Sequence, residues 1–98
     1  MSEPEIDFER VREIMSKLAD LLEDAGFSTP RQEMEAPGPL RTALCAPRNR
    51  ADMAIVEHYI RDLALDIQDE VSINPTDDVL RAQQIVKQAV VALGKCAE

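Results

Sequence analysis

Residues 50–71 read RADMAIVEHYIRDLALDIQDEV, and this stretch decides the fold. Its apolar residues recur every three or four positions, which is the spacing of one face of an α-helix. Asn49 precedes it as a capping residue, whose side chain can accept a hydrogen bond from an amide of the first turn. The sequence therefore predicts a helix over about residues 50–71. Its apolar stripe consists of Met53, Val56, Ile60, Leu63, Ile67 and Val71, widened by Tyr59 and Ala64.

A second helix should follow almost at once. Asn74 and Pro75 are expected to begin it, because proline at the first helical position loses only an amide that has no partner within the helix. Gly94 is expected to end it, so the helix should cover about residues 75–93. The connection to the preceding helix is short, which predicts an antiparallel helical hairpin. The apolar stripe consists of Val79, Ala82, Val86, Ala89, Val90 and Leu93.

Toward the N-terminus, a third stripe predicts a helix over about residues 3–25. Ser2 and Glu5 form the Ser-x-x-Glu pattern of a capping box at its start. Gly26 follows its last apolar residue, where a helix often ends in the left-handed conformation. The stripe consists of Phe8, Val11, Ile14, Met15, Leu18, Leu21, Leu22 and Ala25.

Residues 26–49 should form a long proline-rich linker between the first and second helices, with short turns over 31–35 and 40–45. Together these features predict one small all-α domain over residues 1–98, a three-helix bundle that contains the hairpin of the second and third helices. Three aliphatic stripes with only 3% aromatic residues enclose a thin core. A homodimer built from two such hairpins is therefore the alternative to a monomer.

The chain carries 11 basic and 19 acidic residues, a net charge of −8. This balance disfavours direct binding to nucleic acid or to an anionic membrane, because both reward lysine and arginine. The longest apolar runs, 53–56 and 89–93, are far shorter than the ~20 residues of a membrane span, and the N-terminus has no apolar signal segment. Cys45 and Cys96 suit free thiols in a reducing compartment, so a cytoplasmic protein is expected.

Acidic residues stand where helices normally avoid them. A carboxylate in the last turn of a helix opposes the helix dipole, at a cost of about 0.3–1 kcal/mol when exposed. Local stability therefore does not account for these residues. The first helix ends with Asp20, Glu23 and Asp24, and the second with Asp66, Asp69 and Glu70.

On the second helix, Asp62, Leu65, Asp66 and Asp69 should lie together with His58 on the flank away from the core. Three interpretations are open for this flank. It is a solvated face with one stray leucine, or a docking surface for a protein partner with a basic surface and an apolar hole. In the third interpretation, arginines of the chain itself fold over these carboxylates. They come from residues 27–50, a segment with four arginines and only two acidic residues. Asp62, Leu65, Asp66 and Asp69 are the candidate partner-binding residues.

The same residues do not predict catalysis or metal binding. Ligands on one straight helix cannot surround an ion, and these point away from the core, so no metal site and no cofactor are expected. Cys45 lies near Arg48 and Arg50 in the sequence, but His58 is the only histidine that could act as its base, and no third group to orient it is evident. The sequence predicts no catalytic residues, and the protein is not expected to be an enzyme.

The expected function is a non-catalytic protein–protein interaction module, such as a small acidic regulator, adaptor, antagonist or chaperone. One alternative is an inhibitor that mimics nucleic acid and blocks a DNA- or RNA-binding protein. Another is a divalent-cation-dependent hydrolase that uses the carboxylates of the second helix, of which only Asp52 and Glu70 approach the core face. The three-stripe pattern is too general to indicate a family.

Overall fold

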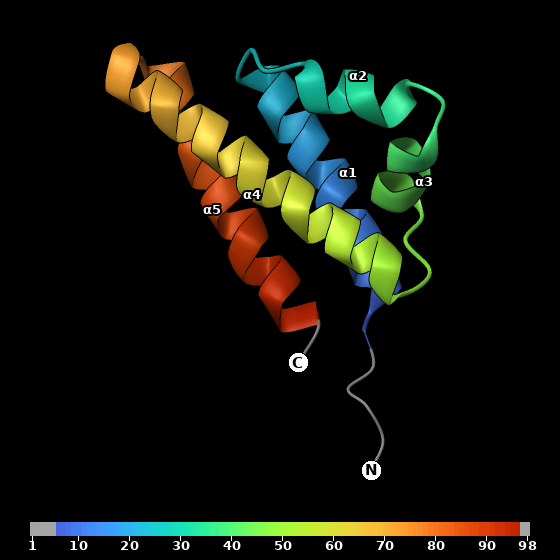
Figure 1. Cartoon of the computed structure of the whole chain (residues 1–98). Coiled ribbons are helices and arrows are strands. Elements are labelled where there is room, and N and C mark those ends of the chain that lie inside the picture. The colour runs from blue at the N-terminus through green and yellow to red at the C-terminus, as the bar shows by residue number, and fades with distance from the viewer. Residues whose placement is uncertain (1–5, 97–98) are drawn as a thin grey trace.

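The computed structural model describes residues 6–96, and within that range every secondary-structure element is an α-helix. The prediction of an all-helical protein is confirmed. Helix α5 packs against both α1 and α4, α3 packs against α4 and α1, and α2 lies against α1 and α3. Figure 1 shows α4 and α5 side by side, with the short helices α2 and α3 on the far side of α1 from α5. The five helices of the described residues are α1 (Phe8–Asp24), α2 (Thr29–Glu35), α3 (Pro39–Cys45), α4 (Arg50–Ile73) and α5 (Asp77–Cys96).

The core is aliphatic and is built mainly from α1, α4 and α5. The molecule measures 48 × 29 × 18 Å, and the smallest dimension fits two layers of helices, since packed helix axes lie about 8–10 Å apart. No polar or charged residue of the described range is buried in the core. Leu21 and Val90, which the stripes place in the core, are instead 37% and 45% exposed. The central residues are Val11, Met15, Leu18, Leu22, Leu44, Met53, Val56, Ile60, Ile67, Val86 and Leu93.

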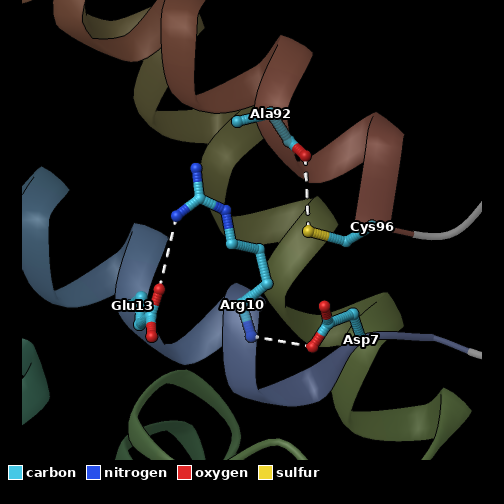
Figure 2. Close-up of polar contacts among 5 residues, drawn as sticks. All are labelled: Asp7, Arg10, Glu13, Ala92 and Cys96. Atoms are coloured by element: carbon cyan, nitrogen blue, oxygen red, sulfur yellow. Dashed lines mark hydrogen bonds and ion pairs between the residues drawn. The ribbon is translucent and has the colours of Figure 1, made fainter.

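Helix α1 begins later than the sequence predicts. Its N-cap is Asp7, whose Oδ1 accepts a hydrogen bond from the Arg10 amide at 3.1 Å (Figure 2). The helix therefore starts at Phe8, and the predicted start near residue 3 is wrong. The predicted capping box of Ser2 and Glu5 lies outside the described residues.

The end of α1 has the predicted left-handed cap. Gly26 has φ +91°, a conformation that costs glycine little because it has no Cβ. Its amide donates to the Glu23 carbonyl at 3.0 Å, and the Phe27 amide donates to the Leu22 carbonyl at 2.7 Å. These two bonds are the Schellman motif, which satisfies carbonyls that the helix itself leaves unpaired.

Helix α4 begins as the sequence predicts. The Asn49 side chain accepts a hydrogen bond from the Asp52 amide at 2.9 Å, which confirms the predicted N-cap. The helix runs through Ile73, two residues further than the expected end. The extra residues extend the apolar surface, because the Ile73 side chain is 78% exposed.

The boundaries of α5 also differ from the prediction. The Thr76 hydroxyl accepts a hydrogen bond from the Val79 amide at 3.2 Å, so the cap lies at Thr76 and the predicted start at Pro75 is wrong. At the other end, Gly94 does not terminate the helix, which continues to Cys96. Since Gly94 has an ordinary helical backbone and open space around it, nothing there forces the chain to turn.

The predicted linker over residues 26–49 is part of the folded body. It contains α2 and α3, each with a proline in its first turn, and the short turns expected over 31–35 and 40–45 lie within these two helices. Pro30 and Leu44 are buried, so the two short helices contribute to the core. The bend between them falls at residues 36–38, before Pro39, where a helix cannot continue.

Two polar contacts join α2 to α4 and to α3. The Tyr59 hydroxyl of α4 hydrogen-bonds the Glu33 carboxylate of α2. The Cys45 thiol of α3 donates to the Met34 carbonyl at 3.3 Å. Burial, with the Glu33 carboxylate beside it, raises the pKa of Tyr59 above its ordinary value near 10, because both disfavour the phenolate.

Within the described residues, no helix is long and apolar enough to cross a membrane.

Candidate functional site

The four predicted docking residues all lie exposed on α4. Leu65 is 59% exposed, and its neighbours Asp62, Asp66 and Asp69 are exposed as well. Asp62 contacts His58 one turn earlier, with 3.3 Å between Oδ2 and Nε2, and this contact is an ion pair only when the imidazole is protonated. Both side chains are mostly in solvent, so this pair is worth at most a few tenths of a kcal/mol.

The structure separates the four residues into two groups. Asp66 and Asp69 line a pocket of about 310 Å³ together with Glu70, whereas Asp62 and Leu65 lie outside that lining. The pocket forms where the segment leading into α2 meets the second half of α4. Its apolar part combines the buried Pro30 with three further side chains, and its acidic part comes entirely from α4. The lining consists of Phe27, Thr29, Pro30, Leu63, Asp66, Ile67, Asp69 and Glu70.

The carboxylates at the end of α1 have a cation of their own. Arg31, on α2, forms an ion pair with Asp20 and lies with its Nε 3.6 Å from Glu23 Oε2. Arg81 of α5 donates a hydrogen bond to the Asp24 carbonyl at 3.3 Å. A tertiary contact thus accounts for acidic residues that local helix stability does not explain.

The carboxylates at the end of α4 have different surroundings. Among the described residues, no lysine or arginine lies within ion-pair distance of Asp66, Asp69 or Glu70. The interpretation in which linker arginines fold over the α4 acids is therefore wrong for Arg31, which instead pairs with Asp20 and Glu23 of α1. The α4 carboxylates remain available to a cation from outside the described fold.

Neither cysteine is placed as a nucleophile. The Cys96 thiol is buried and donates to the Ala92 carbonyl at 3.3 Å, as Figure 2 shows. Burial, followed by the negative charge of Asp7, raises the pKa of Cys96 and so disfavours its thiolate. Cys45 is partly buried and uses its thiol in the contact with α2. Both thiols are free and have structural partners.

The described part of the chain contains no group of three or more histidine, cysteine, aspartate or glutamate side chains that could hold a metal ion. The α4 carboxylates and His58 follow one another along a single helix. They can therefore attract a cationic group from one side, but they do not converge on a point.

Sequence reasoning identified the acidic flank but not the full pocket. Phe27 and Pro30 lie more than thirty residues from Asp66, and they reach it only because α2 packs back along α1. No periodicity within α4 indicates this contact. The burial of Pro30, in the first turn of α2, depends on the same packing of α2 against α1, to which the ion pair of Arg31 with Asp20 also belongs.

Comparison of the chain with protein-family models, with curated proteins and with solved structures finds no match. Its function is therefore argued from the geometry of these side chains alone.

Proposed function

We propose that this protein is a non-catalytic interaction module, a small acidic regulator, adaptor, antagonist or chaperone, which binds a protein partner through the outer face of α4. Asp62, Leu65, Asp66 and Asp69 make the contact. One observation carries the proposal: Asp66, Asp69 and Glu70 line one side of a partly apolar pocket, and no lysine or arginine of the described residues lies within ion-pair distance of them. A docking face of this kind explains acidic residues that weaken the helix on which they stand.

The pocket defines the chemistry of the partner. A lysine or arginine side chain can lay its aliphatic stem against the apolar lining of the pocket while its charge meets Asp66 and Asp69. Leu65, one turn away, then adds apolar contact outside the pocket. The partner should therefore present a basic residue next to an apolar depression. Charged contacts of this kind mainly accelerate association and select the partner, while the buried apolar contact sustains the complex.

The two free thiols support a reducing location, so the module is proposed to act in the cytoplasm. The homodimer expected from the aliphatic stripes also remains a prediction. It requires a second surface, because the acidic face of α4 would repel its own copy.

The test is charge reversal on the docking face. The variant carrying Asp62→Lys, Asp66→Lys and Asp69→Lys is compared with a control carrying Glu9→Lys, Glu35→Lys and Glu57→Lys. The control residues are exposed acids without an ion pair in the described range. Each variant replaces three acidic residues with three lysines, so the two variants have the same net charge. Each chain is used to capture proteins from nuclease-treated lysate of the source organism, and helicity is checked by circular dichroism. We expect a specific protein with the native chain and the control, and its loss with the docking-face variant.

Two outcomes would count against the proposal. Equal capture by the native chain and the docking-face variant would mean that α4 is a solvated face. Capture of nucleic-acid-binding proteins that heparin displaces, with both triple variants weakened alike, would favour the alternative function as a nucleic-acid mimic. A mimic depends on total charge along its surface, whereas a docking face depends on three positions.

A further inference from the structure

A second uncovered surface lies on the hairpin of α4 and α5, away from the acidic face. A groove of about 420 Å³ runs between the two helices and is lined by residues of α4 and α5 alone. Helices α1, α2 and α3 contribute nothing to it. Its apolar lining consists of Ala64, Ile67, Val86, Val90 and Val91.

The groove is bordered by apolar side chains that the fold leaves in solvent. Val90 is 45% exposed and Val91 is 59% exposed, although Val90 continues the helical spacing that the sequence assigns to the core. Leu80, near the start of α5 and outside the groove lining, is 42% exposed. A single exposed apolar residue needs no explanation, but several that flank an apolar groove mark a contact surface.

Charge indicates what covers this surface. Of the residues that line the groove, Lys87 is the only charged one, and the polar remainder is Gln68 and Gln83. Two copies of a chain with net charge −8 repel each other, so they can meet closely only where carboxylates are absent. The groove is such a place, because no aspartate or glutamate is among the residues that line it.

We propose that two copies of this chain pair through the α4–α5 groove. The two hairpins then form a four-helix bundle, in which Val90 and Val91 of each copy fill the groove of the other. With two-fold symmetry, each copy covers the groove of the other, and the assembly is complete with two copies. The groove and the acidic pocket share only Ile67, which is buried, and the groove contains none of the carboxylates of the docking face. The pairing and the proposed function can therefore be tested separately.

Sedimentation equilibrium of the whole chain, from micromolar to millimolar concentration, tests the pairing. The weight-average mass should rise from that of one chain toward twice that value. Raising the salt concentration should strengthen the association, because it screens the repulsion between two acidic chains while the apolar contact remains. Docking on the acidic face would show the opposite dependence on salt.

Val91→Glu is the decisive variant, and Leu65→Glu is its matched control. Both residues are 59% exposed on long helices, and both substitutions add one negative charge. Val91→Glu should weaken association by roughly 100-fold, because a two-fold interface brings two new carboxylates together in an apolar contact. Leu65→Glu should leave the association unchanged.

Three results would overturn the pairing: a single-chain mass at every concentration, association that survives Val91→Glu, or association that Leu65→Glu abolishes. Capture of a basic partner distinguishes this failure from that of the proposed function. The partner should still bind the Val91→Glu variant and should be lost with Leu65→Glu. Circular dichroism of both variants confirms that the helices are intact.

Discussion

Helices α1 and α4 each end with three carboxylates, but the surroundings of the two ends differ. At the end of α1, Arg31 pairs with Asp20 and Glu23, and Gly26 completes a capped turn. The end of α4 has no basic side chain of the described range within ion-pair distance of its acids, and Ile73 projects into solvent. The comparison teaches that one unfavourable charge pattern can have two causes. In α1 the fold itself uses the acids, whereas in α4 they await a partner under our proposal.

The largest test of this contrast truncates one leucine in each helix. Leu22 of α1 is fully buried and Leu65 of α4 is mostly exposed. Leu22→Ala should lower the free energy of unfolding by about 3 kcal/mol because it leaves a cavity, whereas Leu65→Ala should change it by less than about 0.5 kcal/mol. Urea denaturation followed by circular dichroism measures both. If Leu65→Ala lowered the free energy of unfolding as much as Leu22→Ala, the outer face of α4 would be part of the folded core and would not be a free surface.

A second test concerns the first half of α4, where Tyr59 contacts Glu33 of α2. Tyr59→Phe removes the hydrogen bond to Glu33 and should lower the free energy of unfolding at pH 7 by about 1 kcal/mol. The folded state raises the pKa of Tyr59, so the contribution of this hydroxyl is fully present below the unfolded value near 10. It is lost as the pH rises from there toward the higher folded value.

The measurement is urea denaturation of both proteins at pH 7 and pH 11. The difference in free energy of unfolding between the native chain and Tyr59→Phe should be smaller at pH 11 than at pH 7. Only the native chain carries the Tyr59 phenol, and at pH 11 this phenol ionises more readily in the unfolded state than in the folded state. An advantage that stays constant between the two pH values would mean that the phenol is not held neutral by the fold.

The smallest test compares the carboxylates directly. Neutralising the α4 pair with Asp69→Asn and Glu70→Gln should raise the free energy of unfolding by roughly 0.5 kcal/mol, because charges that oppose the helix dipole are removed. Neutralising the α1 pair with Asp20→Asn and Glu23→Gln should instead lower it by a similar few tenths of a kcal/mol, because Arg31 loses its partners. Opposite signs at low salt sharpen the comparison, and both effects should fade in high salt. A gain in both variants would mean that Arg31 contributes nothing.

The long helices could be predicted from sequence because each carries an apolar stripe with a local capping residue. Asn49 and Gly26 are examples whose chemistry is decided within four residues of the helix end. The start of α1 was misplaced because Ser2 and Asp7 both offer capping side chains. Local chemistry alone does not decide between two adequate caps.

The short helices and the groove could not be predicted in the same way. A seven-residue helix is too brief to show a periodic stripe, so α2 and α3 resembled turns in a linker. Val90 has the spacing of a core residue, yet it is exposed because no other helix covers that side of the hairpin.

For the docking face, the helical wheel placed Leu65 and its acidic neighbours on the outside of α4, and these residues are exposed in the structure. The pocket beside them depends on Phe27 and Pro30, which a distant helix brings to the same place. Local periodicity thus describes a face of one helix, but a pocket needs the tertiary arrangement of several.

The contact between the first and last helices has a consequence for how the chain folds. The Asp7 amide donates to the Cys96 carbonyl at 3.1 Å, and α1 packs along α5. During translation α1 emerges before the other described helices and its main helical partner emerges after them, so the part of its apolar stripe that α5 covers stays exposed until α5 has been synthesised. Once α5 has been synthesised, it can pair with α4 locally, because only three residues join the two helices. We therefore expect docking of α1, with its large loop-closure entropy, to be the slow step of folding.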